Sequence, residues 1–383
     1  MKKTILILAN SSGGLYDFRN ELVLRLLDKY RVVASLPDTV RTAELAAEGV
    51  EIVETSINRR GVNPIEDLKL MKAYRKLLAE IKPDLVLTYT IKPNIYGGYC
   101  CGQKKIPYIT TITGLGSTFQ KPGLLRTMIT IMYKAGLKKA SCVFFQNSEN
   151  LEIFKKYHIV ESKRYHVVES KNGKREATGA IGSNQKCRLV SGSGVDLTRH
   201  QPEPYPEEAC TRFLYIGRVM REKGIREYLE AAKQMHDEQT VFQILGYCDE
   251  DYEEQLVQAE KDGVVEFLGF HPEVHEYIKN ASAIVLPTYH EGMSNVLMEA
   301  SATARPVLAS NISGCKEIFD EGVTGFGFAP ENSDDLIRAL QKFKRLNWAE
   351  RRTMGLAART KMEQEFDRRL VADAYLEEIC NNS

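Results

Sequence analysis

Short apolar runs rich in β-branched residues alternate with longer helical patterns along almost the whole chain. Strands of this kind are typical of parallel sheets that are covered on both faces, and consecutive parallel strands need a crossover connection, usually a helix. The alternation therefore predicts an α/β protein built from strand–helix–strand units. Its 383 residues, of which 43% are hydrophobic, suffice for two or three domains.

The expected strands form two series, separated by a proline-rich stretch at 201–206. The first series comprises 4–10, 31–36, 51–56, 84–90, 108–113, 142–146 and 165–168, and the second comprises 213–216, 241–245, 264–268, 283–286, 306–309 and 325–329. Ligands of doubly wound sheets bind beyond the carboxyl ends of the strands. We therefore expect Rossmann-like domains at 1–200 and 201–366 with a cleft between them. A last helix at 367–383 could return to the first domain.

The composition indicates which binding partners and which cellular location to expect. With 52 basic and 51 acidic residues the net charge is +1, which argues against a nucleic-acid-binding protein. The eight cysteines are scattered without Cys-x-x-Cys spacing, so we expect reduced thiols, no zinc site and a cytoplasmic location. The apolar N-terminal run ends at Asn10, which favours a first strand over a signal peptide, and no apolar segment is long enough to span a membrane.

A Glu-Gly turn follows the strand expected at 283–286 and opens a helix. The first amides of that helix, at 293–296, can bind a diphosphate without a metal ion, and Gly292 would let the backbone approach it. Side chains lean toward the amino end of a helix, so Glu299 could accept hydrogen bonds from two ribose hydroxyls, while Glu291 would lie near a sugar. The alternative is that Glu299 is a solvated helix residue.

A second turn, at 217–224, brings Arg218 and Lys223 to the end of the strand expected at 213–216. A guanidinium can clamp phosphate oxygens through two parallel bonds, and an ammonium acts as a point charge. We therefore expect both cations to neutralise a leaving diphosphate. The alternative is a solvated basic loop whose cations form surface ion pairs.

Two further turns are ambiguous. Gly13 and Gly14 follow the first strand, and Thr113 and Gly114 follow the strand at 108–113. The first of these turns matches neither a P-loop nor a dinucleotide-binding fingerprint. Each turn is as consistent with ordinary turn chemistry as with a sugar or anion contact.

Taken together, these motifs resemble those of the retaining glycosyltransferases of family 4, which have the GT-B architecture of two Rossmann-like domains. They are Glu291 to Glu299, the turn at 217–224, Ser-Gly-Val-Asp at 193–196 and Val-Thr-Gly-Phe at 323–326. In the first half, 89–97, 113–116 and 59–64 resemble bacterial enzymes that build capsule, O-antigen, N-glycan and related saccharides on undecaprenyl diphosphate.

The resemblance implies roles for the matching residues. Arg218 and Lys223 would hold the donor diphosphate, Glu299 the ribose, and Gly13 and Gly14 would face the donor. The transferred sugar would contact Glu291 and the backbone of Gly292, Met293, Ser294, Asn295 and Val296. The resemblance also implies retention of the anomeric configuration, with Glu291, Arg218 and Lys223 at the catalytic centre and the donor diphosphate helping to deprotonate the acceptor.

Two positions need separate interpretation. Many members of that family carry a histidine where this chain has residues 112–114, so the contact made by that imidazole is missing at this turn. Asp249 and Asp251 have the Asp-x-Asp spacing of some metal sites, but we interpret them as charges at a helix amino end. We expect neither a metal ion nor a cofactor.

The acceptor side is expected in the first half of the chain. Arg59, Arg60 and Lys92 are candidates for binding its diphosphate, with Thr113 and Gly114 beside them. Segment 121–139 is either a basic amphipathic helix on an anionic membrane or a core-facing helix. The sequence does not separate the two, because apolar residues have the same helical spacing in both. Its expected apolar face is Leu124, Leu125, Met128, Met132 and Leu137, and its cations are Arg126, Lys134, Lys138 and Lys139.

The expected function is transfer of a hexose or N-acetylhexosamine from a UDP-sugar to a polyprenyl-diphosphate-linked saccharide. The enzyme would be cytoplasmic, peripheral on the inner face of the cell membrane, and metal-independent. The sequence shows no convincing nucleophile–base pair, so electrostatic stabilisation of the leaving diphosphate would contribute most of the rate enhancement. Two alternatives stay open, an epimerase of UDP-N-acetylglucosamine with the same architecture and a non-catalytic subunit that binds a nucleotide sugar.

Overall fold

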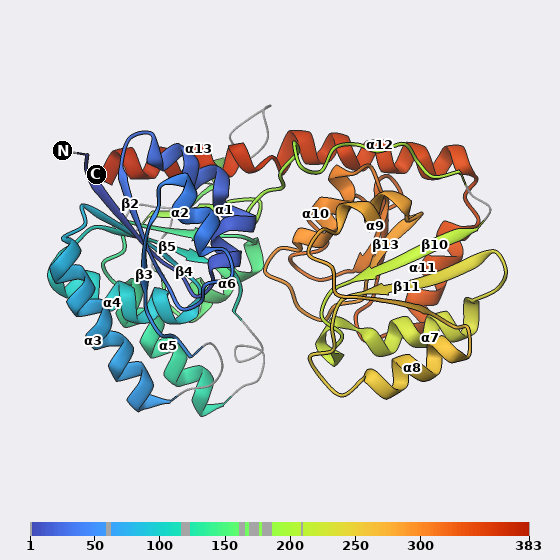
Figure 1. Ribbon diagram of the computed structural model, residues 1–383, viewed down its shortest axis with the longest axis horizontal. Coiled ribbons are helices and arrows are strands. Elements are labelled where there is room, and N and C mark those ends of the chain that lie inside the picture. The colour runs from blue at the N-terminus through green and yellow to red at the C-terminus, as the bar shows by residue number, and fades with distance from the viewer. Residues whose placement is uncertain are drawn as a thin grey trace. The chain divides into compact units, whose positions relative to one another are not determined.

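The structure is a computed structural model that describes residues 2–58, 63–115, 123–160, 165–167, 176–177, 186–207 and 210–382. The chain divides into two compact units. The first comprises Met1–Gly194 together with Arg368–Ser383, and the second comprises Val195–Asp367. Both are α/β units around a mainly parallel sheet, which confirms the expected fold class (Figure 1).

The first unit contains a nine-stranded sheet in the order β3-β2-β1-β4-β5-β6-β9-β7-β8. Its strands are β1 (Thr4–Leu8), β2 (Arg31–Leu36), β3 (Glu51–Glu54), β4 (Leu85–Tyr89), β5 (Tyr108–Ile112), β6 (Cys142–Phe145), β7 (Tyr165–Val167), β8 (Glu176–Ala177) and β9 (Lys186–Leu189). Neighbouring strands are parallel except β7 and β8. Strands β8 and β9 were not predicted from the sequence, and residues 168–175 and 178–185 on either side of β8 lie outside the described residues.

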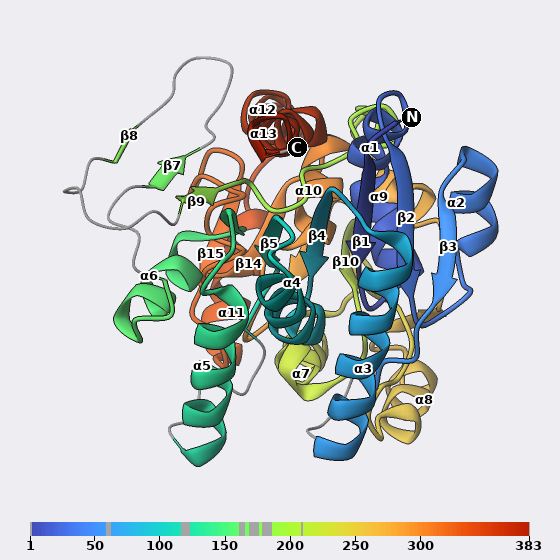
Figure 2. The same ribbon diagram turned by 90° about the vertical axis from the view of Figure 1, so that its left-hand side faces the viewer.

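Helices cover both faces of this sheet (Figure 2). They are α1 (Ser12–Leu27), α2 (Thr42–Glu48), α3 (Pro64–Ile81), the π-helix η1 (Pro93–Gly97), α4 (Gly98–Lys104), α5 (Leu124–Leu137), α6 (Ser148–Lys156) and α13 (Arg368–Asn382). One face packs against α3, α4 and α5, and the other against α1 and α13. Because Tyr375 stacks on Phe144 with ring centroids 4.0 Å apart, α13 is part of the first unit's core.

The second unit has six parallel strands in the doubly wound order β12-β11-β10-β13-β14-β15. They are β10 (Thr211–Ile216), β11 (Thr240–Leu245), β12 (Glu266–Gly269), β13 (Ala283–Leu286), β14 (Val307–Ser310) and β15 (Gly325–Phe328). The helices are η3 (Arg221–Lys223), α7 (Ile225–Met235), α8 (Glu253–Lys261), α9 (His275–Asn280), α10 (Asn295–Ala302), α11 (Ser333–Lys344) and α12 (Trp348–Glu365).

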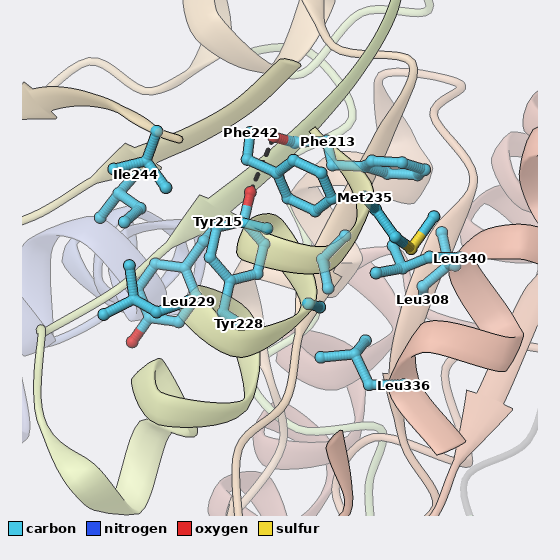
Figure 3. Packing of buried hydrophobic residues seen from close by; sticks show 14 of the residues in the cluster. Phe213, Tyr215, Tyr228, Leu229, Met235, Phe242, Ile244, Leu308, Leu336 and Leu340 are labelled. Carbon is cyan, nitrogen blue, oxygen red and sulfur yellow. Dashed lines mark hydrogen bonds between the residues drawn. The ribbon is translucent and has the colours of Figure 1, made fainter. Parts of the chain in front are cut away.

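The core of the second unit fixes the strand ends on which the site is built. An aromatic cluster between β10, β11 and α7 is fully buried (Figure 3). Within it, the Tyr228 hydroxyl donates to the carbonyl oxygen of Phe213 at 2.8 Å, so its polar end is satisfied. Among the described residues, none of the helices is both long and apolar enough to cross a membrane.

Candidate active site

The turns that follow β10 and β13 are joined by direct backbone contact. Gly224, at the end of the first turn, has φ +72°, and a Cβ there would lie 2.0 Å from the carbonyl oxygen of Pro287. Only glycine permits this approach, because the conformation and the space both exclude a side chain. The amide of Tyr289 donates to the carbonyl oxygen of Glu222 at 2.9 Å, which closes the contact.

This contact brings Lys223 and Glu291 together. The Lys223 ammonium donates to Glu291 Oε1, and the two side chains are only 19% and 16% exposed. Burial raises the pKa of the Cys315 thiol and of the Tyr215 hydroxyl, and the nearby Glu291 carboxylate adds to both effects. The two charged residues, predicted separately from two turns, therefore form one partly buried pair.

Arg218 is paired as well, but it is more accessible. Its Nη1 lies 2.6 Å from Asp249 Oδ2, and its side chain is 41% exposed. The Tyr215 hydroxyl donates to the carbonyl oxygen of Arg218 at 2.7 Å and holds the backbone of the turn. The interpretation of Asp249 as a helix-end charge is wrong, because α8 begins only at Glu253 and the Asp249 carboxylate binds Arg218.

The amino end of α10 is where the diphosphate amides were expected. Ser294 is its N-cap, and the Ser294 hydroxyl accepts from the amide of Leu297 at 3.4 Å. The amide of Ser294 itself donates to the carbonyl oxygen of Gly314 at 2.8 Å. Ser294 therefore caps the helix and anchors the turn, and its amide already has a partner within the protein. Glu299, on the second turn of α10, is partly exposed.

A loop after β14 supports the Glu291 turn, and its role was not predicted from the sequence. Gly314 in this loop has φ +87°, and a Cβ there would lie 2.8 Å from the carbonyl oxygens of both Glu291 and Gly292. The Gly314 amide donates to Glu317 Oε2 at 2.7 Å. A Ser-Gly pair soon after the strand expected at 306–309 was the available signal. This loop and the turn that carries Lys223 therefore both hold the Glu291 turn in place.

In the first unit, Gly13 and Gly14 belong to the first turn of α1. Ser11 is the N-cap, and its hydroxyl accepts from the Gly14 amide at 3.1 Å. A Cβ at Gly13 would make only ordinary contacts, 3.6 Å to Asp17 Oδ2 and 3.7 Å to Ser11 Oγ. Packing within the protein therefore does not require glycine at position 13.

Lys92, also in the first unit, is half of an ion pair. Its ammonium lies 2.8 Å from Asp67 Oδ1 on α3, and the side chains of Lys92 and Asp67 are 14% and 8% exposed. Burial raises the pKa of Tyr96, and its hydrogen bond to Asp67 adds to the effect. Lys92 and Asp67 line an open groove of about 590 Å³ between α3 and the end of β3. The diphosphate role proposed for Lys92 would require this pair to separate.

The other acceptor candidates are less constrained. Thr113 and Gly114 are partly exposed directly after β5. Arg59 and Arg60 lie outside the described residues. Between β4 and Lys92, the β-branched residue Thr90 has φ +72°, a strained conformation that costs about 1–3 kcal/mol and is concentrated at functional sites. Sequence carries no signal for this strain.

Comparisons with known proteins agree with the geometry. A family model described as "Glycosyl transferase 4-like" matches residues 4–147, and one described as "Glycosyl transferases group 1" matches residues 210–344. The N,N'-diacetylbacillosaminyl-diphospho-undecaprenol alpha-1,3-N-acetylgalactosaminyltransferase of Campylobacter jejuni is 26% identical over 388 residues, which cover 96% of each chain. Both halves of the chain therefore match glycosyltransferase models, and the chain is a glycosyltransferase.

Other relatives and solved structures are consistent with a glycosyltransferase. The putative colanic acid biosynthesis glycosyltransferase WcaL of Escherichia coli is 29% identical over 205 residues, half of each chain. The crystal structure of Anabaena HepE in complex with UDP matches with a TM-score of 0.76 at 16% identity and covers 100% of both chains. The expected GT-B fold is thereby confirmed. Within the described ranges, no three His, Cys, Asp or Glu residues are grouped so that they could hold a metal ion.

Proposed function

We propose that this glycosyltransferase moves a hexose or N-acetylhexosamine from a UDP-sugar to a polyprenyl-diphosphate-linked saccharide, with retention of configuration. The observation that carries the proposal is the cluster of Arg218, Lys223 and Glu291 beside the start of α10. The name of the Campylobacter relative, which contains a diphospho-undecaprenol acceptor, supports the choice of acceptor. Donor binding is assigned to the second unit and acceptor binding to the first.

In this mechanism the ion pairs of the free protein exchange for pairs with the donor. Arg218 and Lys223 neutralise the diphosphate as the bond from the anomeric carbon to its oxygen breaks. The Glu291 carboxylate then accepts hydrogen bonds from the sugar. The acceptor oxygen attacks from the face that UDP leaves, and its proton passes to a diphosphate oxygen. The backbone of residues 292–296, apart from the Ser294 amide that already donates to Gly314, and the Glu299 carboxylate position the sugar and the ribose.

The two side-chain cations supply the positive charge that a metal ion supplies elsewhere, so we propose that turnover needs no metal. We expect the rate to be the same in EDTA as in magnesium. Loss of turnover in EDTA that magnesium restores would contradict this part of the proposal.

The acceptor determines where the enzyme works. A polyprenyl-diphosphate-linked saccharide is anchored in a bilayer, so the enzyme would be peripheral on the inner face of the cell membrane. Neither the epimerase alternative nor a non-catalytic subunit is favoured by an observation in the structure.

Release of UDP in the presence of a lipid-linked acceptor tests the proposal directly. A thermal-shift panel tests the donor, and we expect UDP compounds to stabilise the protein more than GDP compounds. Ligand at about 100 times its Kd contributes about 2.7 kcal/mol. Glu299→Ala should remove most of this stabilisation, whereas Glu254→Ala, at an exposed position on α8, should not. Equal shifts with UDP and GDP, or no UDP release with any lipid-linked acceptor, would overturn the proposal.

A further inference from the structure

Helix α5 has two apolar faces that point in different directions. Ile129, Tyr133 and Leu137 are at most 8% exposed and pack into the core beneath the sheet. Leu124, Leu125, Met128 and Ile131 are instead 88%, 46%, 37% and 61% exposed. Their spacings of three, four and seven residues place them on one stripe. The apolar face expected from sequence was therefore wrong in part, since Met132 and Leu137 pack inward and Ile131 belongs to the outer stripe.

Helix α3 carries a second exposed apolar site at its amino end. Ile65 and Leu68, one turn apart, are 69% and 50% exposed. Helices α3 and α5 follow the parallel strands β3 and β5, so both begin on the side where those strands end. Figures 1 and 2 show the amino ends of both helices projecting on the same side of the first unit. The two apolar sites can therefore meet a single flat surface.

The charge around α5 is strongly asymmetric. From Leu85 to Ser148 the sequence contains no Asp or Glu, but it contains eight cations, so this segment carries +8 in a chain whose net charge is +1. The cations are Lys92, Lys104, Lys105, Lys121, Arg126, Lys134, Lys138 and Lys139. Lys134 and Lys138, on α5 and at its end, are exposed beside the stripe. The exposed apolar residues of α5, flanked by cations without carboxylates, complement an anionic lipid surface. Helix α3 is close to neutral, with four cations and three carboxylates.

We propose that this α3–α5 surface, formed by Ile65, Leu68, Leu124, Leu125, Met128 and Ile131, docks on an anionic phospholipid bilayer. The apolar side chains enter the headgroup region, and the cations of α5 contact lipid phosphates. A second copy of the chain fits less well, because it would bring two basic α5 helices together. The inference rests on the proposed function, which places the acceptor in a membrane, and it adds the surface and the lipid charge that hold the enzyme there.

Sedimentation with lipid vesicles tests the surface. The intact protein should sediment with vesicles that contain phosphatidylglycerol and much less with pure phosphatidylcholine. Leu124→Ser combined with Leu125→Ser should weaken binding to the anionic vesicles by about tenfold or more. The matched control is Leu24→Ser on α1, because Leu24 is 43% exposed, close to the 46% of Leu125. This control should bind as the intact protein does.

Two further measurements keep the outcomes distinct. Turnover of a detergent-solubilised lipid-linked acceptor should be unchanged in the Leu124/Leu125 double variant, because the stripe lies outside the proposed catalytic residues. Absence of turnover in the intact protein would count against the proposed function and not against the surface. Unchanged vesicle binding by the double variant would overturn the inference. So would equal binding to both vesicle types, or a change of oligomeric state in place of a change in vesicle binding.

Discussion

The two units are both built on mainly parallel sheets, yet different structures follow the carboxyl ends of their strands. In the second unit, the turns after β10 and β13 contact each other through backbone, with Gly224 at the point of closest approach. In the first unit, α3 and α5 project from that side and expose apolar residues. One sheet therefore ends in a compact polar site suited to a small charged ligand, and the other in a surface suited to a large one.

Each unit has a cation paired with a carboxylate, but the two cations differ in how accessible they are to a ligand. Arg218 and Lys92 each bind one carboxylate, but their side chains are 41% and 14% exposed. A diphosphate can replace Asp249 at Arg218 while water solvates the released carboxylate. Separating Lys92 from Asp67 would leave a buried carboxylate without its partner, which is costly. We infer that Arg218 is a ligand-binding cation and that Lys92 has a mainly structural role.

The largest effect on activity is expected at Lys223. Lys223→Met removes one of the two cations that would stabilise the leaving diphosphate, so kcat/KM should fall by about 10²–10³-fold. Steady-state kinetics with a UDP-sugar and a lipid-linked acceptor measure this. Lys233→Met, at an exposed position on α7, is the control and should keep full activity. Similar kinetics for both variants would mean that Lys223 serves only the fold.

Lys92→Met should affect stability more than substrate binding. The change leaves Asp67 buried without a cation, and we expect the free energy of unfolding to fall by about 3 kcal/mol. Adding Asp67→Asn to the same variant should restore most of the loss, because no buried charge then remains. Urea denaturation measures both changes. A stable Lys92→Met variant with a raised KM for the acceptor would instead support the diphosphate role.

The contact between the two turns can be tested with a matched pair of glycines. Gly224 and Gly263 have nearly the same φ, +72° and +70°, but nothing lies within 4 Å of a Cβ at Gly263. Alanine should lower the free energy of unfolding by about 1 kcal/mol at either position, because a residue with a side chain adopts this positive φ poorly. Gly224→Ala should lower the free energy of unfolding by about 2 kcal/mol more than Gly263→Ala does. It should also lower activity, because the new methyl group displaces Pro287. Equal losses in thermal unfolding would show that the turns are not tightly joined.

Much of this architecture could be predicted from the sequence. Parallel strands buried on both faces are continuous apolar runs, so most strands of both sheets were located to within two residues. Their order and parallel direction place the residues that follow them at one edge of the sheet, and this placement made Arg218, Lys223 and Glu291 candidates for the site. The charged residue types and the neighbouring glycines supplied the chemical argument.

Contacts between turns could not be predicted. Lys223 and Glu291 are 68 residues apart, and Arg218 and Asp249 are 31 apart, so each pairing depends on which strands become neighbours. The direction of the apolar residues on α5 was also undetermined, because Ile131 and Met132 fit one broad apolar arc until the position of the sheet is known. Both misses concern tertiary contacts.

The smallest expected effect is a gain in affinity at Arg218. In the free protein Asp249 occupies the guanidinium that a diphosphate must bind, so Asp249→Asn removes a competing negative charge. The Arg218–Asp249 pair is partly exposed, so we expect it to contribute about 0.5–1 kcal/mol. Asp249→Asn should therefore bind UDP about two- to fivefold more tightly, which calorimetry can measure. Asp251→Asn, at an exposed position two residues away, controls for the general change in charge. Weaker UDP binding by Asp249→Asn alone would instead mean that Asp249 orients Arg218 for the ligand, and that this site depends on its carboxylates as the Lys92–Asp67 pair does.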